Sequence, residues 1–202
     1  MLTRAINLFS SFLKSISYEN RDEIIHRWVE YHSQPFRFYH NHNHILDCIE
    51  QLEKVRGFVR NNHRFEMALW YHDIFYIPGS SINEIASGDI ALNDCKILSL
   101  NYGNEVKELI INGSLKPDKK DYDSLIFHDI DFSILGSDER EYVTYMQNIR
   151  LEFLYFDNFK VEREKFLRGL LKKNIYFTEF FKDTYQKKAV ENIKRELNKE
   201  YV

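Results

Sequence analysis

Side chains that could bind a metal ion gather in three short segments of the chain. Five of the eight histidines lie in FYHNHNHI at 38–45, in the pair His72-Asp73 and in FHDIDF at 127–132. Imidazole and carboxylate groups are common ligands of divalent transition metals. These segments are therefore the first candidates for a functional site. A fourth segment, NEIAS at 83–87, adds a further acid, Glu84.

The alternation of His40, His42 and His44 allows two structural interpretations. On a strand all three imidazoles would share one face, whereas at the start of a helix His40 and His44 share a face and His42 points elsewhere. The helical context of the segment favours the second interpretation. Without other ligands nearby, a surface cluster at a helix N-terminus would explain the three histidines equally well.

The pair His72-Asp73 lies late in the apolar run MALWYHDIFY, which predicts a helix over residues 64–75. Neighbouring helical residues diverge by about 100°, but both side chains can still reach one ion that lies between them. A carboxylate among apolar residues is costly unless it is paired or metal-bound. The alternative is that Asp73 caps a helix and accepts hydrogen bonds from backbone amides.

The third segment interrupts an apolar helix with His128, Asp129 and Asp131. Asp131 lies near apolar positions, so we expect it to face inward. The alternative is that one acid pairs with a lysine or arginine and the other is exposed.

Helical spacing of apolar residues dominates the elements that must position these side chains. Stripes predict helices near the N-terminus and over 43–60, 64–75, 82–101, 104–112, 121–135, about 139–155, 159–173 and 178–200. Asp138 and Thr178 are candidate N-caps. The fold class is therefore all-α, and we expect a single helical domain over 1–202, with a helical extension at 1–18 and a core at about 20–200.

Composition excludes several classes of protein. With 44% hydrophobic residues, the 202-residue chain can bury a core, and 7 Gly and 3 Pro argue against a turn-rich β-sandwich or barrel. The net charge of -3 excludes a globally basic nucleic-acid binder. No apolar run is long enough to span a bilayer. Cys48 and Cys95 form no CxxC pair and fit a reducing compartment, so we expect a cytoplasmic location.

Together the motifs resemble the HD-domain superfamily of metal-dependent phosphohydrolases. The chain looks most similar to a bacterial group of predicted HD hydrolases through five segments in consistent order. These are RFYHNHNHI at 37–45, ALWYHDIFYIP at 68–78, NEIAS at 83–87, DIDFSILG at 129–136 and IRLEF at 149–153. The resemblance implies an HD-type helical bundle in which one metal ion is bound by His44, His72, Asp73 and Asp131.

The spacing of Tyr39, His40, Asn41 and His44 is also similar to a motif of cyclic-nucleotide phosphodiesterases. That resemblance implies that His44 is a metal ligand and that His40 is the general acid that protonates the leaving oxygen. Asp131 is the first choice for the fourth ligand. Asp129 is the second choice, and would otherwise orient a ligand histidine or a bound water.

Other candidates are weaker. Glu84 resembles, loosely, an acid of HD enzymes that hydrolyse guanosine tetraphosphate, but a glutamate favoured by the helix macrodipole explains it at least as well. Arg37, Arg150 and Arg163 could bind phosphate, although Arg150 fits better as a partner of Glu152 or of a buried acid.

One departure from the narrower group concerns the stretch LIINGSLKPD at 109–118. Gly113, Leu115 and Lys116 stand where that group often has a Thr-x-x-His-like pattern. A fifth metal-site histidine is therefore missing, which predicts one metal ion rather than two.

The implied activity is hydrolysis of a phosphomonoester or phosphodiester by a metal-activated water. The implied partner is a small phosphorylated substrate, with a nucleotide as the expected class. The cofactor would be one divalent ion (Mn, Fe, Co, Ni, Zn or Mg), which the ligand types alone do not identify. No membrane or nucleic-acid partner is expected, and a homodimer remains open. The alternatives are a metal-binding or nucleotide-sensing module without turnover, and an HD-type di-iron oxygenase.

Overall fold

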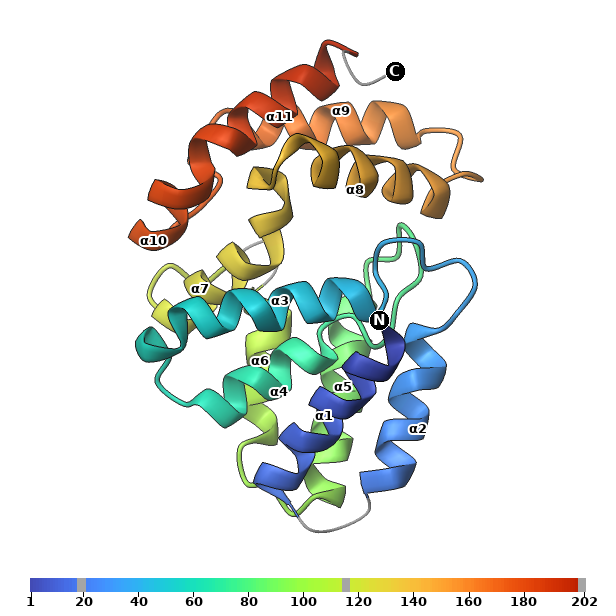
Figure 1. The fold of residues 1–202 in the computed structure, drawn as a ribbon, viewed down its shortest axis with the longest axis vertical. Helices are drawn as coiled ribbons and strands as arrows, with labels where there is room; N and C mark the ends of the chain where they lie inside the picture. Colours follow the sequence, from blue (N-terminus) through green and yellow to red (C-terminus); the bar gives the residue numbers. More distant parts are fainter. Residues whose placement is uncertain (18–20, 114–116, 200–202) are drawn as a thin grey trace.

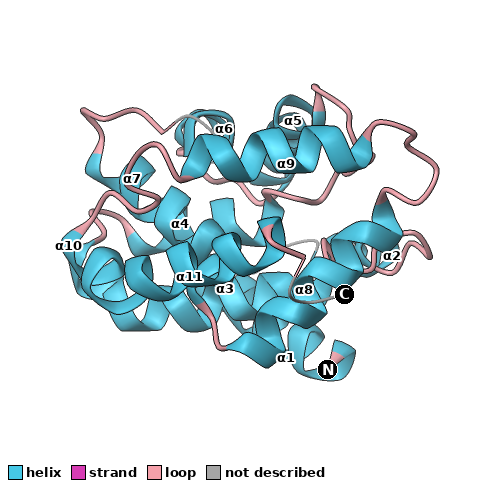
Figure 2. Cartoon of the chain, turned by 90° about the horizontal axis from the view of Figure 1, so that it is seen from above, coloured by secondary structure: helices cyan, strands magenta, loops and turns pink. Residues whose placement is uncertain are grey.

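The protein is built from helices alone throughout the part of the chain that the structure describes. The computed structural model describes residues 1–17, 21–113 and 117–199, and every regular element in these ranges is helical (Figure 2). The predicted all-α class is thereby confirmed. Leu115 and Lys116 lie outside the described residues, as does the last residue of the helix predicted over 178–200.

The first half of the chain forms one group of packed helices, in the lower part of Figure 1. Helix α5 packs on α6, α6 on α4, and α1 on both α2 and α3. The elements are α1 (Leu2–Ile16), α2 (Arg21–His32), α3 (His42–Val55), the 3₁₀ turn η1 (Arg56–Phe58), α4 (Asn62–Tyr71), α5 (Asn83–Ile97) and α6 (Gly103–Gly113).

The second half of the chain covers one side of α3, in the upper part of Figure 1. Helix α7 (Tyr122–Asp131) packs on α3 and continues into the 3₁₀ turn η2 (Phe132–Gly136), which leads into the upper group. The remaining elements are α8 (Glu139–Glu152), α9 (Phe159–Leu170), α10 (Glu179–Phe181), the π-helical turn η3 (Lys182–Gln186) and α11 (Lys187–Leu197).

Side-chain caps fix the starts of three helices. The side chains of Asn41, Asn61 and Asp138 accept hydrogen bonds from backbone N–H groups in the first turns of α3, α4 and α8. Such caps satisfy backbone donors that have no partner within the helix. The predicted cap at Asp138 is confirmed. Thr178 does precede α10, but its hydroxyl makes no capping hydrogen bond.

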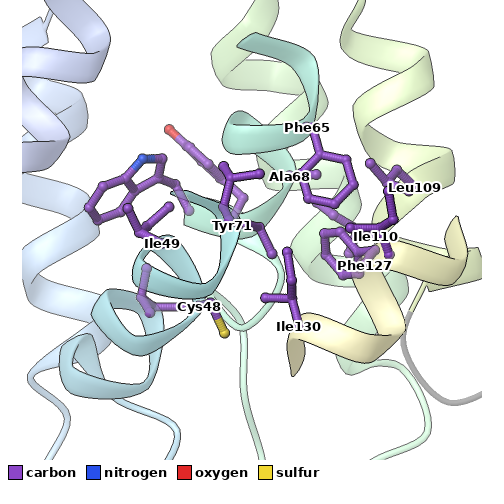
Figure 3. Close-up of a cluster of buried hydrophobic side chains, with 14 of the residues drawn as sticks. Cys48, Ile49, Phe65, Ala68, Tyr71, Leu109, Ile110, Phe127 and Ile130 are labelled. Atoms are coloured by element: carbon purple, nitrogen blue, oxygen red, sulfur yellow. The ribbon is translucent and has the colours of Figure 1, made fainter. Parts of the chain in front are cut away.

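The core is continuous from the N-terminal helix to the centre of the molecule. Phe9 of α1 packs against Trp28 and Trp70, with ring centroids 5.1 and 5.0 Å away. The indole N–H of Trp28 donates to the carbonyl of Trp70 over 2.8 Å. Figure 3 shows how the core continues between α3, α4, α6 and α7, where the apolar face of α3 meets residues of the other three helices. This packing holds α3, α4 and α7 in fixed relative positions.

Helix α2 is missing from the helices predicted from apolar spacing. Its sequence RDEIIHRWVEYH is mostly polar, and its fully buried residues Ile24, Trp28 and His32 repeat only once per turn. Those three positions make a narrow stripe with a histidine at one end. Because the stripe is narrow and partly polar, apolar spacing alone did not reveal it.

Among residues 1–17, 21–113 and 117–199, none of the helices combines the length and the apolar character needed to cross a membrane.

Candidate metal centre

Two imidazole nitrogens and two carboxylate oxygens converge at one point between α3, α4 and α7. His44 Nε2 lies 3.0 Å from His72 Nε2. It lies 3.5 Å from Asp73 Oδ2 and 3.2 Å from Asp131 Oδ1. His72 Nε2 lies 3.3 and 3.7 Å from the same two oxygens. Ligand atoms arranged tetrahedrally about 2.1 Å from one ion are about 3.4 Å apart. The spacing of this cluster therefore fits a bound metal ion.

The four side chains come from the ends of three helices. His44 lies in the first turn of α3, and Asp131 is the last residue of α7. The expectation that His72 and Asp73 lie within a helix is wrong, because α4 ends at Tyr71 and the pair follows it. His72 keeps helical backbone dihedrals as the C-cap of α4, and the side chains of His72 and Asp73 both reach His44 from this helix end.

A backbone contact orients the ring of His72 for metal binding. Its Nδ1 lies 2.9 Å from the carbonyl oxygen of Leu69, which can only accept a hydrogen bond. The hydrogen therefore lies on Nδ1, and the lone pair of Nε2 points into the cluster. Donation from the second ring nitrogen to a carbonyl is the usual way in which proteins fix a ligand histidine.

Cys48 is a further candidate ligand that the sequence analysis did not identify. Its Sγ lies 3.8 Å from His44 Nε2, one helical turn further along α3. His44, Cys48, His72 and Asp131 offer ligand atoms that all lie within 4.8 Å of one another, so this group could hold a metal ion. Burial raises the pKa of the Cys48 thiol, which favours its protonated form when no cation is near. The i, i+4 spacing from His44 is the signal that points to it, but Cys48 also falls at helical spacing among the apolar residues that predict the helix over 43–60.

The electrostatics of the cluster favour a cation. Burial opposes the charge of Asp131, but hydrogen bonds from His44 and His72 outweigh it and hold the pKa of this carboxyl well below its usual range. Burial also opposes the charge of His72, yet Asp73 and Asp131 outweigh it and raise the pKa of the imidazole. The two ionised carboxylates thus attract positive charge to this point, either protons on imidazole or a metal ion.

His40 lies beside the cluster, but it is not on the helix predicted to carry it. Helix α3 begins at His42, so the expectation that His40 and His44 share a helix face is wrong. The ring centroids of His40 and His44 are nevertheless 5.9 Å apart. What holds His40 in place is a contact with α8, since its Nδ1 lies 2.6 Å from Glu152 Oε2.

Glu152 is fully enclosed and organises the segment around His40. Its Oε1 accepts hydrogen bonds from the backbone N–H groups of Tyr39 and His40, over 2.7 and 2.9 Å. Its Oε2 also accepts from the Tyr76 hydroxyl over 2.8 Å. Burial opposes the charge of Glu152, but the bond with His40 outweighs it and lowers the pKa of the carboxyl. The predicted partner of Glu152, Arg150, is exposed, and Glu152 pairs with His40 instead.

The contacts of Glu152 have a consequence for His40. Because a carboxylate only accepts hydrogen bonds, Nδ1 of His40 carries hydrogen and Nε2 is free to exchange a proton. Burial lowers the pKa of His40, but the charges of Asp73 and Glu152 outweigh it and raise it. A raised pKa favours the protonated imidazole, which is the form that a general acid requires.

Arg37 has a structural role in place of the predicted phosphate binding. Its buried guanidinium donates to the backbone carbonyls of His40, Asp73 and Ile74 over 3.0, 2.5 and 2.9 Å. These bonds tie the segment before α3 to the segment after α4. Arg37 therefore fixes the backbone on both sides of the cluster.

Asp129 is also structural. Its carboxylate accepts hydrogen bonds from the backbone N–H groups of Phe177 and Thr178 and from the Thr178 hydroxyl. None of its contacts involves the four predicted ligands, so the structure does not support Asp129 as a ligand or as a group that orients one. Positions two apart on a helix differ in direction by about 200°, so Asp129 faces the segment before α10 and Asp131 faces α3.

A cavity of about 350 Å³ opens beside the cluster. His40, Asp73 and Asp131 form part of its wall, so an ion held at the cluster would have open positions facing this space. Glu84 lies in the first turn of α5 and lines the same cavity, with no hydrogen bond to the cluster. Arg163 lines it too, whereas Arg150 does not.

Comparison of the chain with protein-family models, with curated proteins and with solved structures found no match in any of the three. The site must therefore be interpreted from its own geometry.

Proposed function

We propose that this protein is an HD-type metal-dependent phosphohydrolase that acts on a small phosphomonoester or phosphodiester, with a nucleotide as the expected class. The observation that carries the proposal is the convergence of His44, His72, Asp73 and Asp131 at metal-binding spacing beside an open cavity. Structural metal sites are usually closed, whereas catalytic sites leave a position for water or substrate.

The residues present fit a divalent ion and assign roles to the side chains around it. His44, His72, Asp73 and Asp131 would hold the ion, with Cys48 close enough to replace one of them. A bound ion would lower the pKa of a water molecule and offset charge on a phosphoryl oxygen. These two effects are the main requirements for hydrolysing a phosphoester.

His40 supplies the proton that the leaving oxygen needs. The bond to Glu152 holds Nδ1 and leaves Nε2 for proton transfer, and the raised pKa favours the charged ring. Glu152 acts through His40 and is a positioning residue. The two cysteines, both free and buried, fit a reducing compartment, so the proposed location is the cytoplasm.

The test is a panel of phosphomonoesters, phosphodiesters and nucleotides, each assayed with Mn, Fe, Co, Ni, Zn and Mg. Asp73→Ala should abolish every activity found, because it removes a ligand. Asp157→Ala, the same change at an exposed aspartate, should leave the activity unchanged. No turnover with any metal would contradict hydrolysis. Full metal binding together with that result would favour a sensing module, and two irons per chain would favour an oxygenase.

A further inference from the structure

The cavity beside the metal cluster has a strongly apolar far wall. Beyond His40, Asp73 and Asp131, it is lined by residues of η2, α8 and α9 and of the loop between the two helices, including Phe132, Leu135, Ile149, Phe153, Phe159 and Phe166. Ligand sites of this size are typically apolar with a few placed polar groups. Here the metal cluster is one polar part of the lining, and Glu84, Glu162 and Arg163 are the other charged side chains.

The aromatic rings of this wall brace one another. Phe153 and Phe159 stack with centroids 5.1 Å apart and planes 20° apart. Phe132 and Phe166 are 6.3 Å apart. On the side nearer the cluster, Tyr76 stacks on His40 with centroids 4.2 Å apart. Flat rings held in this way suit a flat apolar group in the substrate.

The charge of the cavity is mainly negative. Four carboxylates line it, those of Asp73, Glu84, Asp131 and Glu162. Among its described lining residues, Arg163 is the one side chain with a permanent positive charge. A bound divalent ion would offset the charges of Asp73 and Asp131, which leaves Glu84 and Glu162. The extra negative charges of a substrate with several phosphate groups would meet these two carboxylates, which is unfavourable.

Arg163 is already paired within the protein. Its Nε and Nη2 donate to the two carboxylate oxygens of Glu196 over 2.9 and 3.1 Å, and its Nη1 donates to the Tyr145 hydroxyl over 2.8 Å. The bidentate pair neutralises the guanidinium and fixes its orientation. Arg163 is therefore part of the wall and is poorly placed to bind a second or third phosphate.

We infer that the cavity selects a phosphoester with a single phosphoryl group and a flat, uncharged, largely apolar alcohol part, and that it discriminates against di- and triphosphates. The phosphoryl group would lie at the metal cluster and the alcohol part against Phe153, Phe159 and Phe166. This inference rests on the proposed function and narrows its substrate class. Aryl phosphates have this chemistry throughout the alcohol part, whereas nucleoside monophosphates share with it the single phosphoryl group and a flat, uncharged base.

The first test measures binding without turnover. 1-Naphthol carries no phosphate, so its affinity reports on the apolar wall alone and can be measured by its fluorescence. We expect binding to the wild-type protein, and about a tenfold loss in Phe166→Ala, which removes one partly buried ring of the cavity wall. Phe58→Ala, at a phenylalanine that is 61% exposed and outside the cavity, is the matched control. Absent binding, or equal binding in all three proteins, would overturn the inference.

The second test compares kcat/KM for 1-naphthyl phosphate, adenosine monophosphate, glycerol phosphate and adenosine triphosphate. We expect kcat/KM for 1-naphthyl phosphate and adenosine monophosphate to exceed the values for glycerol phosphate and adenosine triphosphate by tenfold or more. The better of the two favoured substrates shows whether the natural substrate is an aryl phosphate or a nucleoside monophosphate. Glu162→Lys should raise the efficiency on the triphosphate several-fold relative to 1-naphthyl phosphate. Glu164→Lys, an equal charge change on α9 outside the cavity, should not. Preference for the triphosphate or for glycerol phosphate would overturn the inference.

The two tests separate this inference from the proposed function. If 1-naphthol binds through Phe166 but no phosphoester is cleaved, hydrolysis is wrong and the apolar site stands. If phosphoesters are cleaved without preference for a flat apolar group, hydrolysis stands and the inferred selectivity is wrong.

Discussion

Glu152 Oε2 lies 2.6 Å from His40 Nδ1, which joins the last turn of α8 to the segment before α3. The two residues are 112 positions apart in the sequence. His40 is the proton donor assigned to the proposed reaction, and a residue from the second half of the chain therefore holds it in position.

The first prediction concerns this bond. Glu152→Gln removes the negative charge that favours the protonated imidazole, so the pKa of His40 should fall. As the pH rises, the general acid should lose its proton at a lower pH in the variant than in the wild type. The basic limb of the activity profile should therefore shift to lower pH. The pH profile of kcat on a substrate with a poor leaving group checks this. Glu141→Gln, at an exposed position of the same helix, is the control, and identical profiles would show that Glu152 does not act through His40.

The second prediction separates the roles of His40 and His44. His44→Ala should lose metal and activity together, whereas His40→Ala should keep metal and lose turnover by about 10²–10⁴-fold. The loss in His40→Ala should shrink with nitrophenyl esters, whose leaving group needs little protonation. Metal content and kcat are measured in both variants. If His40→Ala loses metal as His44→Ala does, His40 is a ligand and not the acid.

The third prediction assigns Asp129 to stability. Asp129→Ala leaves the partly buried N–H group of Phe177 and the buried N–H group of Thr178 without their acceptor, which should lower the free energy of unfolding by about 2–4 kcal/mol. Metal content should not change. Urea unfolding and metal analysis of the same sample test both statements. A loss of bound metal with unchanged stability would show that Asp129 belongs to the metal site.

The fourth prediction concerns the pH dependence of stability. Burial, with a smaller effect from the charge of Arg37, lowers the pKa of His32 to about 3. The unfolded chain therefore takes up a proton near pH 6.5 that the folded chain does not, and stability falls as the pH drops from about 6.5 towards 3. Between pH 6.5 and pH 5 the free energy of unfolding should fall by about 2 kcal/mol.

The ring centroids of His32 and Trp28 are 4.2 Å apart. His32→Phe keeps a ring that can stack on Trp28 and removes the titrating group. The free energy of unfolding, measured by urea titration at several pH values, should therefore fall less steeply with acid in this variant than in the wild type. The same substitution at the exposed His26 serves as the control. Parallel curves for the wild type and His32→Phe would contradict a neutral buried imidazole.

Local pattern was enough to predict much of the fold. The all-α class followed from apolar spacing, and the cap at Asp138 followed from residue type, because both depend on neighbours within one or two turns. His44, His72, Asp73 and Asp131 were named as a set, and the structure brings them together. Their convergence depends on packing between three helices. The family resemblance implied this convergence, whereas spacing along the sequence alone could not predict it.

The errors have a common physical cause. Asp129 and Asp131 were hard to distinguish because both are acids on an apolar helix, and only the position of Phe177 and Thr178 decides which one faces away from the cluster. Glu152 was assigned to a neighbour in sequence, whereas its partner is 112 residues away. Contacts of that kind depend on the tertiary fold, so a local pattern carries no signal for them.

The metal centre between α3, α4 and α7 is best tested by the metal content of the protein purified without chelator. We expect at most about one divalent ion per chain, the load of a site with four protein ligands. The ion should be lost in both His72→Ala and Asp73→Ala and kept in the control His26→Ala, which removes an exposed histidine. Full metal content in both His72→Ala and Asp73→Ala would contradict the assignment of this cluster as a metal centre.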